Sequence, residues 1–430
     1  MKPGSWLPGL LAIAALALTA CLPEGVRLPQ SEFLSVLERK AGLIAYLGYD
    51  GNIYVVDQGG ATPTQITTDA EVSESRYRVY SLPVWDAAGQ RLAFAAYEGQ
   101  GNQNPTKNSL HVAQRDGSGL TEAYASPSYV IFYYWSPDGR NLGVLSETPG
   151  GTLALKLVPA DGGETQTIDT GAPFYWGWAP DGQSVLIHAN GVNGRLAFLE
   201  LGETVVERGL DVVPTGFKAP AYSPDGRQVL YAGRTEAGTS ALYVADRDGA
   251  NPRALADYQS EISFVWSPDG RRVAYIDAAA AAGAGPIVVV DPSGRSQPVT
   301  LDEAAYAFFW SPDSRSLAYF ATEVVTPEAG TDGGDAAAQS ATVWKLMVMD
   351  ARSGTARRIA TFAPTERFLQ LLPYFDQYHQ SLTIWSPDSQ NLVVSAYAGD
   401  GVPGIFVVAA SGNLDPRFIA EGLVGVWSWK

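Results

Sequence analysis

The sequence of 430 residues contains very little cysteine or histidine. There is one Cys, and there are three His. A single thiol excludes a disulfide framework and any metal cluster held by thiolates. Three histidines leave little material for a zinc site. We therefore expect no metal and no cofactor.

Basic residues are also scarce. Lys and Arg number 29 against 45 Asp and Glu, which gives a formal net charge of −16. A chain this acidic, with no basic block, is repelled by phosphate polymers and by anionic lipid headgroups. This excludes nucleic acid as the partner. The chain still has a large core to bury, because 46% of its residues are hydrophobic and only 17% are charged.

Long hydrophobic runs are absent except near the start of the sequence. Residues 6–18 are apolar, but this run is shorter than a typical membrane-spanning helix and is interrupted by Pro8 and Gly9. It ends in Leu-Thr-Ala-Cys at 18–21. This ending resembles the lipobox of bacterial lipoproteins, whose Cys is alkylated by a diacylglycerol and becomes the new N-terminus.

The lipobox resemblance implies a signal peptide at 1–20, lipidation of Cys21, and a short linker at 21–40. Two or three acyl chains would hold the protein stably on a bilayer. It would then be an extracytoplasmic, membrane-anchored lipoprotein of the cell envelope or periplasm. A secretory signal cut at a nearby alanine is the alternative.

A five-residue motif recurs through the rest of the sequence. In its fullest form it reads Trp-Ser-Pro-Asp-Gly, and the copies at 178, 222, 266 and 310 begin 44 residues apart. Regular self-similarity of this length is typical of stacked supersecondary units. The copies begin at Trp135, Trp178, Tyr222, Trp266, Trp310 and Trp385, with a degenerate copy at Trp85.

Each repeat predicts a blade of four antiparallel strands. Ser-Pro-Asp-Gly is a hairpin turn, because Pro presets φ, Asp accepts hydrogen bonds from backbone amides, and Gly takes a positive φ. The aromatic residue before the turn ends the innermost strand and can lie between adjacent sheets. No single blade can bury both of its faces, so the blades are expected to stack radially.

The two ends of the repeat region predict how the ring closes. Residues 41–57 supply the second and third strands of a unit that lacks its first strand, and residues 423–428 supply a first strand. Joined, they form one blade. We therefore predict an all-β fold, an eight-bladed β-propeller over residues 41–430. Seven blades is the alternative if the degenerate copy at Trp85 does not form a full blade.

The repeated motif resembles the TolB-like propeller repeats, which also occur in the propellers of the dipeptidyl peptidase IV and prolyl oligopeptidase families. The resemblance covers residues 41–430 and implies a propeller. It implies little about function, because the family includes binding domains, gating domains and some enzymes. No G-x-S-x-G nucleophile elbow is present, so no peptidase residue can be carried over.

The polar residues of the repeats are interpreted as structural. His111 and His188 fall in predicted strands of different blades and are expected to be packing or surface residues. A pair of carboxylates for glycoside cleavage is an alternative that stays open, because the sequence does not show which Asp and Glu side chains converge. The repeated aspartates are interpreted as turn residues: Asp138, Asp181, Asp225, Asp269, Asp313 and Asp388.

Three long inserts are predicted to share the face opposite the motif turns, because the strands alternate in direction. They span 98–108, 322–340 and 363–380. The third is rich in aromatic residues, which is typical of a recognition surface but also of a plug over the channel mouth. Both interpretations are open. Its candidate ligand-binding residues are Phe368, Tyr374, Phe375, Tyr378 and His379.

The sequence therefore predicts a monomeric, lipid-anchored propeller that binds a protein, peptide or glycan of the cell envelope without catalysis. One alternative is an envelope hydrolase or lyase with carboxylates in the central channel. Another is a structural subunit of an envelope complex. Convergent Asp, Glu or His side chains in the channel would favour the enzyme, whereas an aromatic and uncharged mouth would favour binding.

Overall fold

The computed structural model describes residues 40–192, 194–278, 283–325 and 341–430. The predicted signal peptide, Cys21 and the linker up to residue 39 lie outside these residues, as does most of the insert at 322–340. Within the described ranges, no helix has the length and apolarity needed to cross a bilayer.

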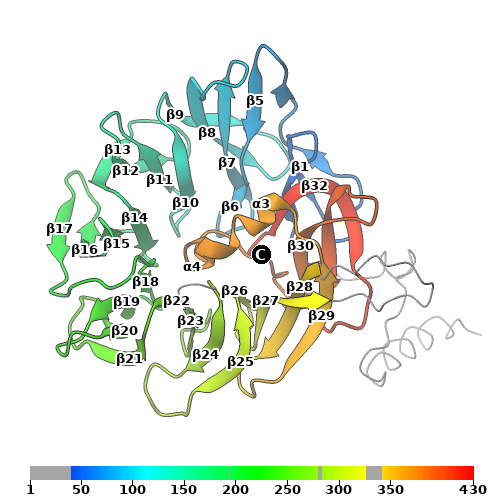
Figure 1. Cartoon of the computed structure of the whole chain (residues 1–430). Helices are drawn as coiled ribbons and strands as arrows, with labels where there is room; N and C mark the ends of the chain where they lie inside the picture. The colour runs from blue at the N-terminus through cyan, green and yellow to red at the C-terminus, as the bar shows by residue number, and fades with distance from the viewer. Residues whose placement is uncertain (1–39, 193, 279–282, 326–340) are drawn as a thin grey trace, which may run out of the picture.

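The described strands form seven antiparallel sheets arranged around a ring (Figure 1). This confirms an all-β propeller. Five of the sheets have four strands each, taken in sequence order. They contain β10 (Val130–Trp135), β11 (Asn141–Glu147), β12 (Leu153–Pro159) and β13 (Gln166–Gly171); β14 (Phe174–Trp178), β15 (Ser184–Ala189), β16 (Arg195–Glu200) and β17 (Val206–Gly209); β18 (Ala221–Tyr222), β19 (Gln228–Arg234), β20 (Ser240–Asp246) and β21 (Arg253–Tyr258); β22 (Glu261–Trp266), β23 (Val273–Ala278), β24 (Gly285–Val290) and β25 (Val299–Ala305); β26 (Ala307–Trp310), β27 (Ser316–Val325), β28 (Ala341–Asp350) and β29 (Ala356–Phe362).

The degenerate copy of the motif forms a complete blade. Its innermost strand pairs with the next strand, with Trp85 opposite Leu92, and two further strands follow in order. A short hairpin extends the same sheet. The strands are β4 (Glu71–Val72), β5 (Tyr77–Tyr80), β6 (Val84–Trp85), β7 (Arg91–Gly99), β8 (Lys107–Gln114) and β9 (Thr121–Ser126).

Both ends of the repeat region meet in the seventh sheet, which has the strand order β3-β2-β1-β32-β31-β30. Ile44 pairs with Trp427 and Leu47 with Val424. The predicted closure of the ring by N- and C-terminal strands is thus confirmed. The strands are β1 (Ile44–Gly48), β2 (Ile53–Val56), β3 (Thr64–Gln65), β30 (Asn391–Tyr397), β31 (Pro403–Ala409) and β32 (Arg417–Trp427).

Counted as hydrogen-bonded sheets, the blades number seven rather than eight, and seven is the stated alternative. The degenerate copy is not the reason, because it forms its blade. The reason is the length of β32, which has 11 residues. Its first half pairs with β31 and its second half with β1. Two repeat units therefore share one six-stranded sheet.

The motif turns have the geometry that their sequence predicts. In the first full copy, the Ser136 hydroxyl donates to Asp138 Oδ1 at 2.6 Å, and the Arg140 amide donates to the same oxygen at 3.1 Å. Gly139 adopts φ 67°, a value that favours glycine. At the equivalent turn, the hydrogen bond from Ser223 holds the pKa of Asp225 below its usual range. The aspartates are turn residues, as predicted.

The aromatic residues before the turns join neighbouring blades. The indole of Trp135 donates to the carbonyl of Val84 at 3.1 Å, and that of Trp385 donates to the carbonyl of Phe309 at 2.9 Å. Each acceptor belongs to the preceding blade. Burying a large apolar side chain stabilises a fold by about 1.5–3 kcal/mol, so each tryptophan combines apolar burial with a directional contact.

The insert at 363–380 folds over the centre of the ring (Figure 1). It forms α3 (Glu366–Leu369), η1 (Leu372–Tyr374) and α4 (Phe375–Tyr378). Thr365 caps α3 by accepting a hydrogen bond from the Phe368 amide. The last helix, α4, contacts β14, β22 and β26, which are innermost strands of three blades. We call residues 366–381 the plug.

Candidate functional site

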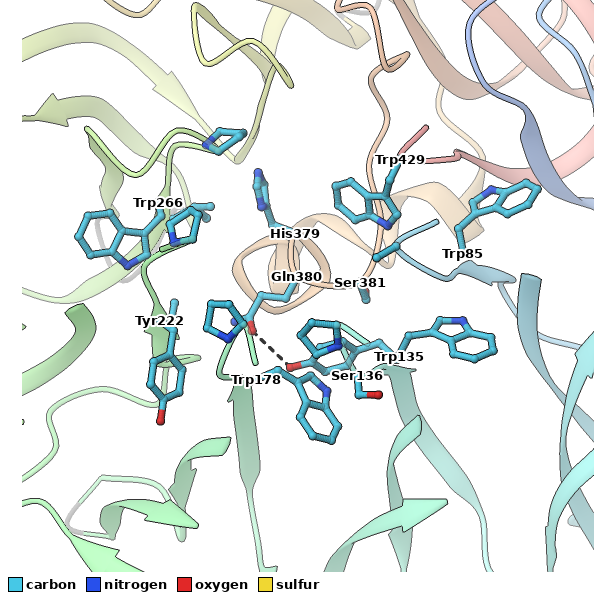
Figure 2. A pocket seen from close by; sticks show the side chains of 18 residues that line it. Trp85, Trp135, Ser136, Trp178, Tyr222, Trp266, His379, Gln380, Ser381 and Trp429 are labelled. Carbon is cyan, nitrogen blue, oxygen red and sulfur yellow. Dashed lines mark hydrogen bonds between the residues drawn. The ribbon is translucent and has the colours of Figure 1, made fainter. Parts of the chain in front are cut away.

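A cavity of about 460 Å³ occupies the central channel on the face that carries the motif turns (Figure 2). We call this face the turn face. The volume lies within the range of about 300–1,000 Å³ that is typical of small-ligand sites. The lining comes from five repeats, from the plug and from Trp429.

The walls of the cavity are built from the repeated motif itself. Four successive repeats each contribute the aromatic residue that begins the motif and the proline two positions later. The pairs are Trp135 and Pro137, Trp178 and Pro180, Tyr222 and Pro224, and Trp266 and Pro268. Every proline ring is held by its hairpin turn. Local turn chemistry therefore produces a rigid and mainly apolar wall around the channel.

The floor of the cavity is the end of the plug. Figure 2 shows His379, Gln380 and Ser381 in the middle of the surrounding aromatic side chains. Tyr134 donates a hydrogen bond to Gln380 Oε1 at 3.3 Å, and Gln380 Nε2 donates to the carbonyl of Pro220 at 3.5 Å. These contacts fix the amide. The floor is the polar part of an otherwise apolar site.

His379 is a neutral residue of this floor. Its Nε2 accepts a hydrogen bond from the Trp310 amide at 3.4 Å, and its ring stacks on Phe309. Burial lowers the pKa of His379 to about 4. An unprotonated Nε2 is required for it to accept the amide hydrogen bond, so the geometry and the lowered pKa agree.

The cavity lining includes no Asp, Glu, Lys or Arg. In the part of the chain that the structure describes, no group of three or more His, Cys, Asp and Glu residues could hold a metal ion. This cavity therefore offers no carboxylate pair for acid–base chemistry. An aromatic and uncharged mouth is the feature expected of a binding site.

The structure places two of the five predicted ligand-binding residues inside the protein. Phe368 and Phe375 are 1% and 2% exposed. Phe375 packs edge-on against Phe308, with 4.8 Å between ring centroids, and Phe368 packs against Phe320 at 5.3 Å. These two side chains belong to the core, as expected for a plug over the channel mouth.

The other predicted residues differ from one another. Tyr378 is half-buried against Phe132, and burial raises its pKa to about 12. His379 lines the cavity. Tyr374 is 51% exposed, which makes it the one member of the set that is open to a partner on the plug side of the ring.

A spacing signal distinguishes the buried plug residues from the exposed one. Phe368, Leu371, Leu372 and Phe375 follow the i, i+3, i+4, i+7 pattern of one helix face, and all four are buried. Tyr374 falls outside this pattern. The sequence does not reveal the cavity, because each copy of the motif on its own predicts only a short hairpin turn.

Other polar side chains of the inner strands are structural. The ring nitrogens of His188 lie 3.0 Å from the carbonyl oxygen of Lys218 and 3.2 Å from that of Gly191, and a neutral ring donates to one of the two. Burial lowers the pKa of His188. His111 pairs with the hydroxyl of Ser109 at 2.9 Å. Both histidines are packing residues, as predicted. Asp376 of the plug is buried, and burial raises the pKa of its carboxyl.

The comparisons with known proteins identify the fold. No protein-family model matches the sequence, and no curated protein matches it either. Among solved structures, the dihydro-heme d1 dehydrogenase NirN is similar with a TM-score of 0.57 and 15% identity, over 95% of this chain and 78% of NirN.

Two further structures are similar. A eukaryotic initiation factor has a TM-score of 0.53 and 12% identity, over 91% of this chain and 98% of that one. TolB from Acinetobacter baumannii has a TM-score of 0.36 and 13% identity, over 83% of this chain and 86% of that one. At these identities, NirN and the initiation factor show only that the propeller architecture is shared. That architecture hosts unrelated functions.

Proposed function

We propose that this protein is an extracytoplasmic, lipid-anchored propeller that binds a protein, peptide or glycan of the cell envelope in the turn-face cavity. The observation that carries the proposal is the composition of the cavity. Its tryptophan and proline rings are held rigidly and it has no charged side chain. Rigid aromatic residues supply much of the binding energy at recognition surfaces, with about 2 kcal/mol or more lost when one is truncated.

Of the five residues predicted to bind ligand, His379 belongs to this site directly. Its neutral ring and the amide of Gln380 supply polar contacts at the floor, where one or two groups of a ligand can be oriented. Tyr374 is the alternative contact residue, because it is exposed on the plug side of the ring.

A matched pair of substitutions tests the site. Ala87 stands in the proline position of the degenerate motif and lines the cavity, whereas Ala88, the next residue, is also exposed and does not line it. Ala87→Trp should fill the mouth and abolish capture of the partner from detergent-solubilised membranes. Ala88→Trp should capture as well as wild type, and both should melt at the wild-type temperature.

A different result would relocate the binding surface. If Ala87→Trp still captures its partner and Tyr374→Ala does not, the ligand binds on the plug side of the ring. If none of the three variants changes capture, neither surface is the site.

The anchor is tested separately. The proposal rests on the sequence Leu-Thr-Ala-Cys at 18–21, which contains the single thiol of the chain. Cys21→Ser should abolish labelling with palmitate and move the protein from the membrane fraction to the soluble extracytoplasmic fraction. A variant that is still labelled and membrane-bound would contradict lipidation at this residue.

A further inference from the structure

One repeat begins with a tyrosine where the other full copies have tryptophan. Tyr222 is buried, and its hydroxyl lies 3.3 Å from that of Ser184 in the preceding blade. The tryptophans at 135 and 385 instead donate to backbone carbonyls of the preceding blade. A phenol is smaller than an indole, so Tyr222 fills less of the space between its two blades.

A groove of about 640 Å³ lies at this position, between the blade of β14–β17 and the blade of β18–β21. Phe198 and Tyr222 supply its aromatic part, and the turn at 225–227 forms one rim. Tyr222 also lines the central cavity. The groove therefore adjoins the cavity at Tyr222.

The groove is charged, in contrast to the cavity. Its side chains carry both signs, and the acidic ones outnumber the basic ones by one. The basic residues are Arg208, Arg227 and Arg247, and the acidic ones are Glu200, Asp225, Asp246 and Asp248. An acidic balance of this kind repels a polyanion such as a nucleic acid or an anionic polysaccharide. A single carboxylate, in contrast, needs only one arginine that the protein does not already hold.

Two of the three arginines are already held by the protein. Arg208 lies over the Phe198 ring at 4.3 Å and donates to the carbonyl of Asp248 at 2.6 Å. Arg247 pairs with Asp181 and lies over the Tyr222 ring. These contacts make the two guanidinium groups part of the groove wall.

Arg227 is held much more loosely. Its guanidinium is 3.8 Å from Asp225, and the two side chains are 85% and 57% exposed. An exposed pair at this distance contributes little to stability, so a ligand carboxylate can displace Asp225 from Arg227 at small cost. Arg227 is therefore the groove residue most able to change its partner.

We propose that the cavity and the groove together form one track for an extended peptide segment of a protein partner. Apolar or proline residues of the segment occupy the cavity, and the chain leaves past Tyr222 so that an acidic side chain or a terminal carboxylate pairs with Arg227. A peptide is favoured because it can present an uncharged part and a charged part within a few residues. This inference rests on the proposed function and adds the ligand class and the exit route.

The test uses a phage-displayed library of short random linear peptides as the probe. Selection against the wild-type protein should yield sequences with an apolar or proline-rich core and an acidic flank on one side. The selected peptides are then synthesised, and their affinities are measured by fluorescence anisotropy for wild type and for four variants.

Tyr222→Trp should close the groove, and Arg227→Glu should repel the acidic flank. Each should weaken binding about tenfold or more, which corresponds to about 1.4 kcal/mol. A matched control, Arg271→Glu, should bind within about twofold of wild type. It makes the same charge reversal at the exposed arginine after the glycine of the neighbouring turn, which lines neither the cavity nor the groove. Arg227 is exposed, so its variant folds even if Tyr222→Trp does not.

The outcomes separate the two proposals. If Ala87→Trp abolishes peptide binding while Tyr222→Trp and Arg227→Glu leave it unchanged, the cavity is the site and the groove is not part of it. If no peptide is selected and neutral oligosaccharides bind instead, the peptide assignment is overturned while the cavity remains a binding site. If neither class binds, the proposed function fails as well.

Discussion

The two faces of the ring use aromatic side chains in different ways. On the turn face, tryptophans and prolines from successive repeats surround a cavity of about 460 Å³. On the other face, the two phenylalanines of the plug are turned inward: Phe368 and Phe375 are almost completely buried, whereas Tyr374 is exposed. Aromatic content alone therefore does not distinguish a recognition surface from a plug. The spacing of the residues and the turns that hold them do.

The largest expected effect concerns the plug. Phe375→Ala removes a buried ring that packs against Phe308, and truncations of this kind cost about 3–5 kcal/mol of unfolding free energy. Tyr374→Ala, at the exposed neighbouring position, should change it by about 0.5 kcal/mol or less. Urea denaturation of both variants measures the difference. Equal destabilisation by the two would mean that the insert does not pack as a plug.

A smaller effect on the free energy of unfolding is expected from pH, through the protonation of His379 at the floor of the cavity. The pKa of His379 is about 4 in the folded protein, against about 6.5 for a free histidine. Above pH 6.5 both states are neutral and stability does not depend on this group. Between pH 6.5 and 4 the unfolded chain binds a proton that the folded protein does not, so stability falls as pH falls. Below pH 4 this contribution is constant.

The size of this pH effect follows from the shift, at about 1.4 kcal/mol per unit of pKa. We expect a loss on the order of 3 kcal/mol from His379 between pH 7 and pH 4. The raised pKa of Asp376 acts in the opposite direction, and the lowered pKa values of His111 and His188 act in the same direction. Comparing urea denaturation of wild type and His379→Gln at each pH isolates the contribution. Parallel pH profiles would contradict it.

The smallest effect on stability is expected from Ser314, in one of the motif turns of the turn face. Ser314 replaces the usual glycine of the motif, has φ 61°, and accepts a hydrogen bond from the Asp269 amide at 3.0 Å. Ser314→Gly removes that bond but also removes the backbone strain, so stability should stay within about 1 kcal/mol of wild type. Ser314→Ala keeps the strain and should be less stable than Ser314→Gly. The reverse order in thermal melts would contradict this account.

Much of the fold can be predicted from the sequence because the repeat specifies its own turn. Ser136, Asp138 and Gly139 each have a defined role in that turn, and the period then places the strands. The number of sheets could not be predicted in the same way. It depends on β32 continuing through Gly422 to join two repeat units, and local propensity does not reveal where a strand changes partners.

The candidate site was predictable only in part. His379 can be chosen as a candidate from the sequence because the chain has only three histidines. Its position at the cavity floor depends on how the plug crosses the ring. Tyr222 differs from the tryptophans of the other full motif copies, and that difference can be read from the sequence. The groove beside it involves Phe198 and Arg208 of another blade, so only the packed structure brings it together.

The continuity of β32 has a consequence for how the ring opens. A strand shared by two repeat units cannot leave one of them without disturbing the other, so the two units should open as one cooperative segment. In hydrogen-exchange measurements, amides of β1, β31 and β32 should then exchange together and among the slowest of the chain. The join between the first and last repeats would be the most persistent part of the ring rather than its weak point.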